Sequence, residues 1–382
     1  MNPRPDDTPT PTSRASAPGF QRVAAIFLTL TGAVLLAWGG RLHEHPLLPV
    51  SVATVHLYVL GVLTMALIGI ALKQLPRWTA VPLPWPGLNP WTLGFLALGA
   101  LTVFLGIGTD LHPWTLLVAS LGVGVALSFF LLQAGIMLIK SPRRDPLTAL
   151  LAIAILSLSG VFVLGGIFLG EYSHGFLPYD RFAMVGTHLT WGLFGWAGIL
   201  LGVTRLAGPR PDSPAFRPSL SWPLVAGALG SLVLVPLTLF TPQLDPRWLW
   251  AAMLPGSIAL AALTLAGRKQ NPGNRYGHAG DLLGLLALTT LLLWPLRPEP
   301  EWRLLFGVLI LPGWSLSQLF GLHEGLRLTG PGRFHLPIHL LAVGLPALGL
   351  FLPWELVWRA GGVLMILSGA LFFGVERLGE SS

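Results

Sequence analysis

Long apolar runs follow one another along the chain, each close to the roughly 20 residues that a helix needs to cross a bilayer. Short stretches rich in proline and tryptophan separate them, as at 75–91, and tryptophan suits the headgroup level of a membrane. The pattern predicts an all-α integral membrane protein, a bundle of about twelve transmembrane helices. We place these at 21–40, 48–72, 91–109, 113–139, 147–170, 182–206, 220–241, 247–267, 279–296, 303–322, 335–352 and 355–375.

The predicted helices leave no room for a soluble domain, so residues 21–377 are expected to form a single polytopic membrane domain. Residues 1–20 are rich in proline, serine and threonine, and carry too little apolar surface to fold; they are predicted to be a disordered cytoplasmic tail. Residues 378–382 are a short cytoplasmic tail. The run at 21–40 lacks a clear cleavage site and is longer than a signal-peptide core, so we expect it to remain as a membrane helix.

Composition and charge agree with this arrangement. Charged residues make up 10% of the chain and hydrophobic residues 53%, whereas roughly a quarter of the residues in soluble domains are charged. With the N-terminus inside, 17 of the 23 basic residues fall in inner segments, as the positive-inside rule requires. This predicts a multi-pass protein of the cell (inner) membrane with both termini cytoplasmic. The same bias explains the net charge of +7, so no nucleic-acid partner is expected.

Several kinds of chemistry are excluded or unsupported. The chain has no cysteine, which excludes disulfides, thiolate ligands, iron–sulfur clusters and covalently attached c-type haem. It has no phosphate-binding glycine loop, no zinc-protease helix and no credible serine triad. Ion-coupled transporters usually carry a charged residue in the middle of a span. The acidic residues closest to that description all lie near predicted helix ends: Asp110, Glu171, Asp281, Glu324 and Glu355.

Two histidines stand inside predicted spans, in similar surroundings. His56 and His188 are each followed by a leucine, then by glycines, and then by a proline where the helix leaves the membrane. Both spans run from outside to inside, so the two imidazoles are expected at similar depth and in one site. An intramembrane histidine is a functional-site hypothesis by default, and imidazole is the commonest protein metal ligand. The alternative is that each histidine only hydrogen-bonds to a neighbouring helix.

The face of the second of these helices adds a geometric argument. At 100° per residue, Gly192 and Gly195 lie within about 40° of His188, so the histidine stands on a strip with almost no side chains. A flat macrocycle could approach there, and so could the backbone of another helix. The predicted metal ligands are therefore His56 and His188, with Gly192 and Gly195 added as cofactor-binding positions.

The other histidines lie nearer the ends of the predicted helices. His335 and His339, four residues apart, share one face at the inner start of a helix and could form a divalent-metal pair. Pro337 between them and their interfacial depth favour a solvated or capping role instead. Loop positions or inner helix ends are expected for His43, His45, His112, His174, His278 and His323.

A family resemblance rests on three stretches of the chain. They read HLYVLGVLTMALIGIALKQLP (56–76), THLTWGLFGWAGILLGVTRLAGP (187–209) and GVLILPGWSLSQLFG (307–321). These resemble the second, sixth and tenth helices of reduced relatives of haem–copper oxidase subunit I, a group that includes NnrS-like membrane proteins. Twelve spans with both ends inside is also the layout of that superfamily.

The resemblance implies roles for both histidines. His56 matches the axial ligand of a low-spin haem near the outer face, and His188 matches the histidine that helps to hold copper or a second metal centre. Relatives often have a second histidine where this chain has Thr190. The ranges 220–241 and 303–322 contain none of the histidines that oxidases carry there, so a complete oxygen-reducing centre is not expected.

Two functions follow as expectations. The first is a haem- or metal-binding membrane protein, with haem and with copper or iron as the metals, in respiratory electron transfer or in nitric-oxide- or haem-related handling. Its partners would be the lipid bilayer and a redox protein. The second is a permease-like or structural bundle without a cofactor. The sequence identifies no catalytic residue and no oligomeric state.

The topology gives a direct test. A small epitope at residue 2 or at residue 382 should stay inaccessible to a membrane-impermeant label in intact cells and become accessible in inside-out vesicles, because both termini are cytoplasmic. Labelling of either epitope in intact cells would contradict the predicted orientation.

Overall fold

The computed structural model describes residues 17–42, 48–109, 113–174, 181–207, 218–237, 251–259, 261–262, 275–293, 308–321, 332–350 and 355–380. Within these ranges all regular structure is helical and no strand occurs. The predicted all-α class is therefore confirmed for the described part of the chain.

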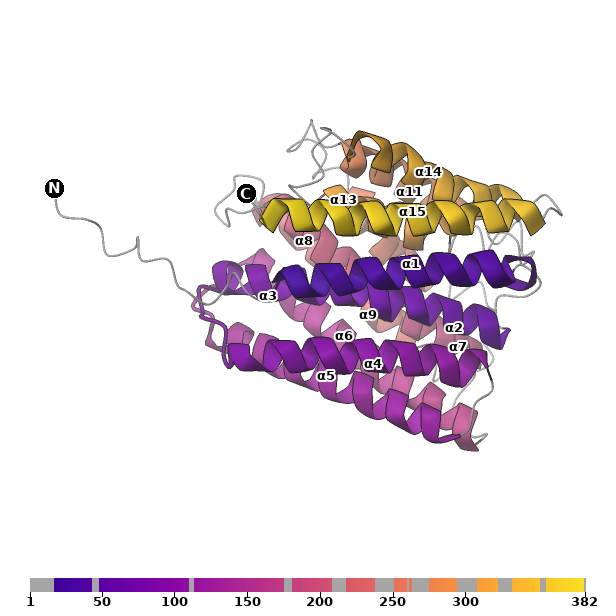
Figure 1. The fold of residues 1–382 in the computed structure, drawn as a ribbon. Coiled ribbons are helices and arrows are strands. Elements are labelled where there is room, and N and C mark those ends of the chain that lie inside the picture. The colour runs from indigo at the N-terminus through magenta and orange to yellow at the C-terminus, as the bar shows by residue number, and fades with distance from the viewer. Residues whose placement is uncertain are drawn as a thin grey trace.

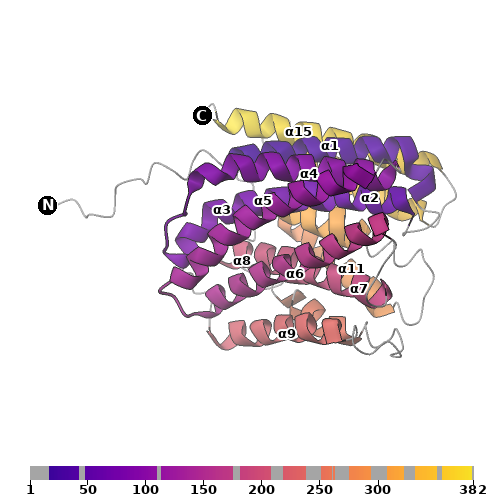
Figure 2. The ribbon, with the colours of Figure 1, turned by 90° about the horizontal axis from the view of Figure 1, so that it is seen from below.

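The helices lie along a common direction and form an elongated bundle (Figure 1). The first half contains α1 (Ala17–Leu42), α2 (Pro49–Tyr58), α3 (Met65–Thr79), α4 (Asn89–Gly108), α5 (Pro113–Lys140) and α6 (Pro146–His174). The second half contains α7 (Arg181–Leu189), α8 (Ile199–Ala207), α9 (Pro218–Leu237), α11 (Arg275–Leu293), α13 (Leu316–Gly321), α14 (Gly332–Gly349) and α15 (Glu355–Glu380). Residues 251–259 are also helical. Seen from below, α1 and α15 lie at one edge of the bundle and α9 at the opposite edge (Figure 2).

Seven described helices are long and apolar enough to cross a membrane. They cover Gly19–Gly39, Pro49–Thr79, Pro86–Gly108, Trp114–Lys140, Pro146–Glu171, Ala183–Ala207 and Glu355–Phe373. Shorter apolar helices occur at Val225–Leu237, Leu309–Phe320 and Phe334–Leu348. Each of the twelve predicted ranges contains described helical residues. The count of twelve full spans stays a prediction.

Large apolar side chains cover the outside of these helices. Ile139, Leu156 and Leu356 are 79%, 70% and 76% exposed. Exposing many apolar side chains of this size to water would cost free energy, and soluble monomeric proteins rarely expose broad apolar patches. Such a surface fits a multi-pass membrane protein in contact with lipid.

Three predicted boundaries need correction. Helix α1 begins at Ala17, so the last four residues of the predicted tail 1–20 are helical, with Pro18 in the first turn where no N–H partner is needed. The helix predicted at 48–72 continues to Thr79 and ends at Ala80, whose φ of 56° is left-handed. Helix α15 continues through Glu380 and takes in most of the predicted tail 378–382.

Glycines bring the first and last described helices together. A Cβ at Gly32 would lie 2.7 Å from the backbone nitrogen of Ile366, and one at Gly39 would lie 2.7 Å from Cβ of Trp358. Because the partner number falls as the glycine number rises, α1 and α15 are antiparallel. Helix α1 therefore begins at the end of the bundle where α15 ends (Figure 1). This agrees with an even number of spans and does not tell which side of the membrane that end faces.

In the part of the chain that the structure describes, three helices contain π-helical segments, whose turns hold nearly one residue more than those of an α-helix. They are η2 (Val59–Thr64) between α2 and α3, η4 (Thr190–Gly198) between α7 and α8, and η7 (Leu309–Ser315) before α13. π-Helical turns are rare and occur frequently at functional sites. They fall in the same three predicted helices that carry the family resemblance.

The contact between α1 and α15 predicts a stability effect. Gly362→Ala places a methyl group 2.6 Å from the backbone nitrogen of Leu36, so the helices must separate, and we expect a loss of about 1–3 kcal/mol of unfolding free energy. Gly94→Ala in α4 is the matched control, because nothing lies within 4 Å of its Cβ position. Alanine is the better helix former, so the control should be neutral or stabilising. Denaturation in mixed micelles measures both; equal stability of the two variants would contradict the packing.

Candidate functional site

His56 and His188 occupy equivalent places in two different helices. Each is the eighth residue of its helix, counted from Pro49 in α2 and from Arg181 in α7. A π-helical segment begins within three residues of each histidine, at Val59 and at Thr190. The similar depth inferred from the sequence thus corresponds to a similar local structure.

The two imidazole rings lie next to each other. Their centroids are 6.2 Å apart and their planes are inclined by 33°. The predicted proximity of His56 and His188 is therefore confirmed. Two imidazoles bound to one metal have centroids roughly 5–6.5 Å apart, because a metal–nitrogen bond to histidine is about 2 Å long. The separation therefore fits a shared metal.

Hydrogen bonding fixes the ring of His56. Its Nδ1 lies 2.8 Å from the backbone carbonyl oxygen of Val52, one turn earlier in α2. A carbonyl oxygen only accepts hydrogen bonds, so Nδ1 carries the proton and Nε2 keeps its lone pair. Histidines that bind metals almost always donate their other ring N–H in this way.

The ring of His188 lies among apolar groups. The ring of Phe168 approaches it edge-on, with centroids 5.7 Å apart. A Cβ at Gly165 would be 3.7 Å from Cε1 of His188, so the imidazole lies over a bare part of α6. Its Nδ1 is buried and has no hydrogen-bond partner among the described residues. An unpaired buried polar atom costs about 1–3 kcal/mol, so this arrangement requires an explanation.

The glycine strip beside His188 faces α6. A Cβ at Gly192 would lie 3.7 Å from Cγ2 of Val161, and one at Gly195 would overlap Oγ of Ser157. His188, Gly192 and Gly195 thus share one face, as predicted. Around Gly195 the strip is filled by α6, which is the small-residue helix packing that the sequence left open as the alternative.

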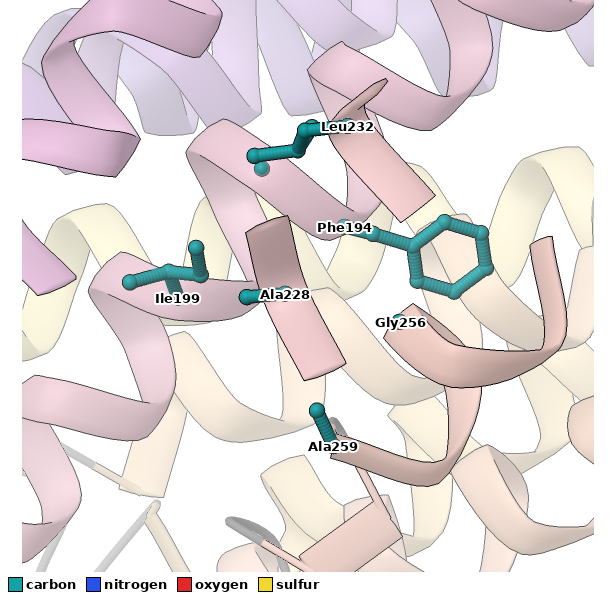
Figure 3. A pocket seen from close by; sticks show the side chains of 7 residues that line it. Phe194, Ile199, Ala228, Leu232, Gly256 and Ala259 are labelled. Carbon is teal, nitrogen blue, oxygen red and sulfur yellow. The ribbon is translucent and has the colours of Figure 1, made fainter. Parts of the chain in front are cut away.

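An apolar cavity lies beside η4 (Figure 3). Its walls come from η4 and α8, from α9 and from residues 251–259, and they consist of Phe194, Gly195, Ile199, Ala228, Leu232, Gly256 and Ala259. No histidine lines it. The cavity is therefore separate from the histidine pair.

The third π-helical segment touches α2 without supplying a histidine. The hydroxyl of Tyr58 donates a hydrogen bond to the carbonyl oxygen of Leu311 at 3.1 Å and lies 3.3 Å from Oγ of Ser315. Helix α2 thus contacts the sixth predicted helix through His56 and the tenth through Tyr58. Tyrosine at this position was not singled out from the sequence, because an interfacial or core tyrosine would give the same pattern.

No group of three or more metal-ligating His, Asp or Glu side chains occurs among the described residues. Any metal between His56 and His188 would thus have two described protein donors, both imidazoles. Iron in a haem needs at most two such donors, because the porphyrin supplies its other four ligands.

The second histidine pair differs from the sequence-based expectation. His335 and His339 are 0% and 1% exposed, so the solvated or capping role is wrong. Nδ1 of His335 lies 3.0 Å from the hydroxyl of Tyr276, and its Nε2 lies 3.1 Å from both Oγ and the carbonyl oxygen of Ser368. Nε2 of His339 lies 2.9 Å from Oγ of Ser317. Helix α14 carries both rings inward against α11, α13 and α15, which the sequence spacing could not show.

The ring of Phe320 packs against both of these histidines, whose own nearly parallel rings have centroids 6.4 Å apart. Its centroid is 4.3 Å from that of His335 and 5.1 Å from that of His339, with both contacts edge-on. The distance between these imidazoles would also suit a shared metal, but their Nε2 atoms already have hydrogen-bond partners, so the arrangement does not favour the divalent-metal pair. These histidines hold helices together.

A buried ion pair was missed by sequence reasoning. Arg205 in α8 and Asp281 in α11 are 4% and 1% exposed and form a two-point ion pair, with Nη2 3.3 Å from Oδ2. Gln318 in α13 donates to Oδ1 of Asp281 at 2.9 Å and to the carbonyl oxygen of Gly277 at 3.3 Å. Both charges lie near helix ends, as expected, but nothing in the sequence relates positions so far apart.

Several other histidines cannot be compared with the predictions. His43, His45, His112 and His323 lie outside the described residues, as does the side chain of His174. His278 lies near the start of α11, as predicted, and its Nε2 is buried without a hydrogen-bond partner among the described residues.

Comparison with known proteins adds no identification. No protein-family model matches the chain, and no curated protein sequence matches it.

The ion pair predicts an asymmetric mutational response. Asp281→Leu leaves the buried guanidinium of Arg205 without its carboxylate, so the free energy of unfolding should fall by about 3–5 kcal/mol. Adding Arg205→Met removes the unpaired charge and should recover most of that loss. Glu355→Leu, which breaks the exposed pair with Arg359, is the control and should cost less than about 1 kcal/mol. Equal losses for the single and double variants would contradict the buried pair.

Proposed function

We propose that this protein is a haem-binding polytopic membrane protein related to haem–copper oxidase subunit I, with His56 and His188 as the ligands. It acts in respiratory electron transfer or in nitric-oxide- or haem-related handling and lacks a complete oxygen-reducing centre. One observation carries the proposal: two intramembrane imidazoles from separate helices lie 6.2 Å apart, a distance that suits a shared metal, and among the described residues neither uses a ring nitrogen to join helices.

The pattern of hydrogen bonds supports ligation over helix bonding. A histidine that serves only to join helices should bond to a neighbouring helix, as His335 does with Tyr276 and Ser368. Among the described residues, His56 bonds within its own helix, to Val52, and Nδ1 of His188 has no partner. Neither therefore has the bonds of the structural alternative.

The available donors fit haem better than a bare ion. Imidazole nitrogens are usual axial ligands of haem iron. His56 already has its Nδ1 proton engaged, which leaves Nε2 for the metal. Bound haem would supply one-electron chemistry. The protein would contribute two axial nitrogens, a surrounding of apolar helices that excludes water, and the orientation of the His56 ring.

The fold supports the same relationship. The antiparallel packing of α1 and α15 suits an even number of spans, which we propose to be twelve, with both termini cytoplasmic. The three π-helical segments lie in the second, sixth and tenth of these spans. A permease-like or structural bundle without a cofactor is the competing proposal, and the packing of Gly195 against Ser157 is compatible with both.

Visible spectroscopy tests the function. Protein purified in mild detergent should show a Soret band that shifts on reduction, and a pyridine haemochrome assay should give haem in stoichiometric amount. His56→Leu and His188→Leu should fold, because leucine is accepted in an apolar core, and should lose the haem or its low-spin spectrum. His335→Leu is the control: it should keep the spectrum and lose about 1–2 kcal/mol of stability with its helix-joining bonds.

Colourless wild-type protein, or a folded His56→Leu variant with unchanged haem content and spectrum, would contradict the assignment. A spectrum lost in His335→Leu and kept in His188→Leu would move the site to the other histidine pair.

A further inference from the structure

A hydrogen bond joins two helix connections at one end of the bundle. Oγ of Ser141, directly after α5, donates to the carbonyl oxygen of Thr79, the last residue of α3, at 2.9 Å. The same hydroxyl accepts a hydrogen bond from the backbone N–H of Arg143 at 3.2 Å. The α3–α4 and α5–α6 connections therefore meet, at the end of the bundle where α1 begins (Figure 2).

Basic side chains gather around this bond. Arg77 lies two residues before Thr79, and Lys140 comes directly before Ser141. The side chains of Arg77 and Lys140 are exposed and have no ion-pair partner among the described residues. The ranges 73–91 and 133–148 together contain five basic residues: Lys73, Arg77, Lys140, Arg143 and Arg144. We call these five residues the basic cluster.

The same two ranges contain a single acidic residue, and its carboxylate caps a helix. Oδ1 of Asp145 accepts hydrogen bonds from the backbone N–H of Thr148 at 2.9 Å and from its hydroxyl at 2.8 Å. One cation of the basic cluster is fixed in place, because Nη1 of Arg144 donates to the carbonyl oxygens of Ser141 at 2.6 Å and Arg143 at 3.0 Å. A guanidinium held in this way suits a phosphate group, whose oxygens accept hydrogen bonds from several N–H groups at once.

An exposed tryptophan lies on the membrane side of the basic cluster. Trp85 is 55% exposed and has a φ of 46°, a left-handed conformation that is rare for residues other than glycine. Nε2 of Gln133 stabilises this backbone by donating to the carbonyl oxygens of Pro84 and Trp85 at 2.8 and 2.9 Å. Gln133 precedes Ser141 by eight residues along α5, so the backbone of Trp85 lies about 12 Å nearer the membrane centre than the Ser141 bond.

This vertical order of groups matches the order of groups in a phospholipid. Cations suit the level of the lipid phosphates, and an indole suits the boundary between headgroups and acyl chains. Ile139, directly before Lys140, is 79% exposed and offers an apolar surface beside the acyl chains. This end of the bundle is also the one predicted to be cytoplasmic, where the leaflet carries negative charge. An anionic headgroup is therefore favoured over a zwitterionic one, which would bring a cation of its own to the basic cluster.

We propose that the α3–α4 and α5–α6 connections form a binding site for one anionic phospholipid. Its phosphate lies at Arg77, Lys140 and Arg144, and its glycerol and upper acyl chains lie against Trp85. The bound lipid bridges from outside the same two connections that Ser141 joins from within. The site does not depend on the proposed haem ligands.

Phosphatidylglycerol is the probe for the first experiment. The full chain, delipidated in mild detergent, is titrated with phosphatidylglycerol or phosphatidylcholine, and native mass spectrometry counts the bound lipid. The first phosphatidylglycerol should bind about tenfold or more tightly than the first phosphatidylcholine. Arg144→Gln should weaken phosphatidylglycerol about fivefold, because one cation near the phosphate is lost. Arg359→Gln, which removes an equal charge at the other end of the bundle, is the control and should stay within about twofold of wild type.

A variant of the tryptophan separates lipid binding from folding. Trp85→Gly removes the exposed indole and also relieves the left-handed backbone, since glycine adopts a positive φ without strain. The thermal stability of the lipid-free variant should equal or exceed that of wild type. Its affinity for phosphatidylglycerol should nevertheless fall about fivefold, because the apolar contact with the lipid is lost.

Each other outcome overturns a stated part of the proposal. Equal affinity for the two lipids overturns the choice of an anionic headgroup, and equal losses in Arg144→Gln and Arg359→Gln overturn the location. Unchanged lipid affinity in Trp85→Gly overturns the role of the indole. Inorganic phosphate should not displace phosphatidylglycerol at equal concentration, because it has no apolar part; displacement would show an ion site in place of a lipid site.

Discussion

The structure depends on one constraint: in a bilayer, polar groups must find their partners inside the protein, because no water is available to them. The backbone meets this requirement by being helical in the described residues, apart from short connections such as 80–85 and 141–145. Some side chains bond to a backbone carbonyl of their own helix, as Thr79 does to Leu75 and His56 to Val52. Others join two helices, as Tyr58 does with Leu311. Every buried polar side chain without a partner is then informative, since it departs from a requirement that most others satisfy.

This constraint separates two kinds of buried polar site. One, near the C-terminal end of α8, joins helices through several bonds: Asp281 with Arg205 and Gln318, and His335 with Tyr276 and Ser368. These contacts connect α8, α11, α13, α14 and α15 and act as structural links. The other site, at His56 and His188, lies in the last turns of α2 and α7 and leaves ring nitrogens available. Along the helix from α7 to α8 the two lie roughly 20–25 Å apart.

Glycine decides which helices can approach each other. Gly32 and Gly362 bring α1 against α15, and Gly195 brings η4 against α6, with backbone or short side chains filling the missing Cβ positions. Close packing of this kind is the usual source of helix association in lipid, where burial of apolar surface gains little. The missing side chain of Gly165 likewise lets the ring of His188 pack against α6.

The sequence by itself determined the helical membrane class, the positions of the apolar helices and the equivalence of His56 and His188, because hydropathy and local context are properties of nearby residues. It also indicated that Gly192 and Gly195 share a face with His188. Only the tertiary structure decided that the two rings meet, that His335 is fully buried, and that Arg205 pairs with Asp281, 76 residues away. Such contacts depend on how helices that are far apart in the sequence pack together. They also depend on where π-helical turns change the direction in which the following side chains point. Neither feature is visible in the local sequence around these residues.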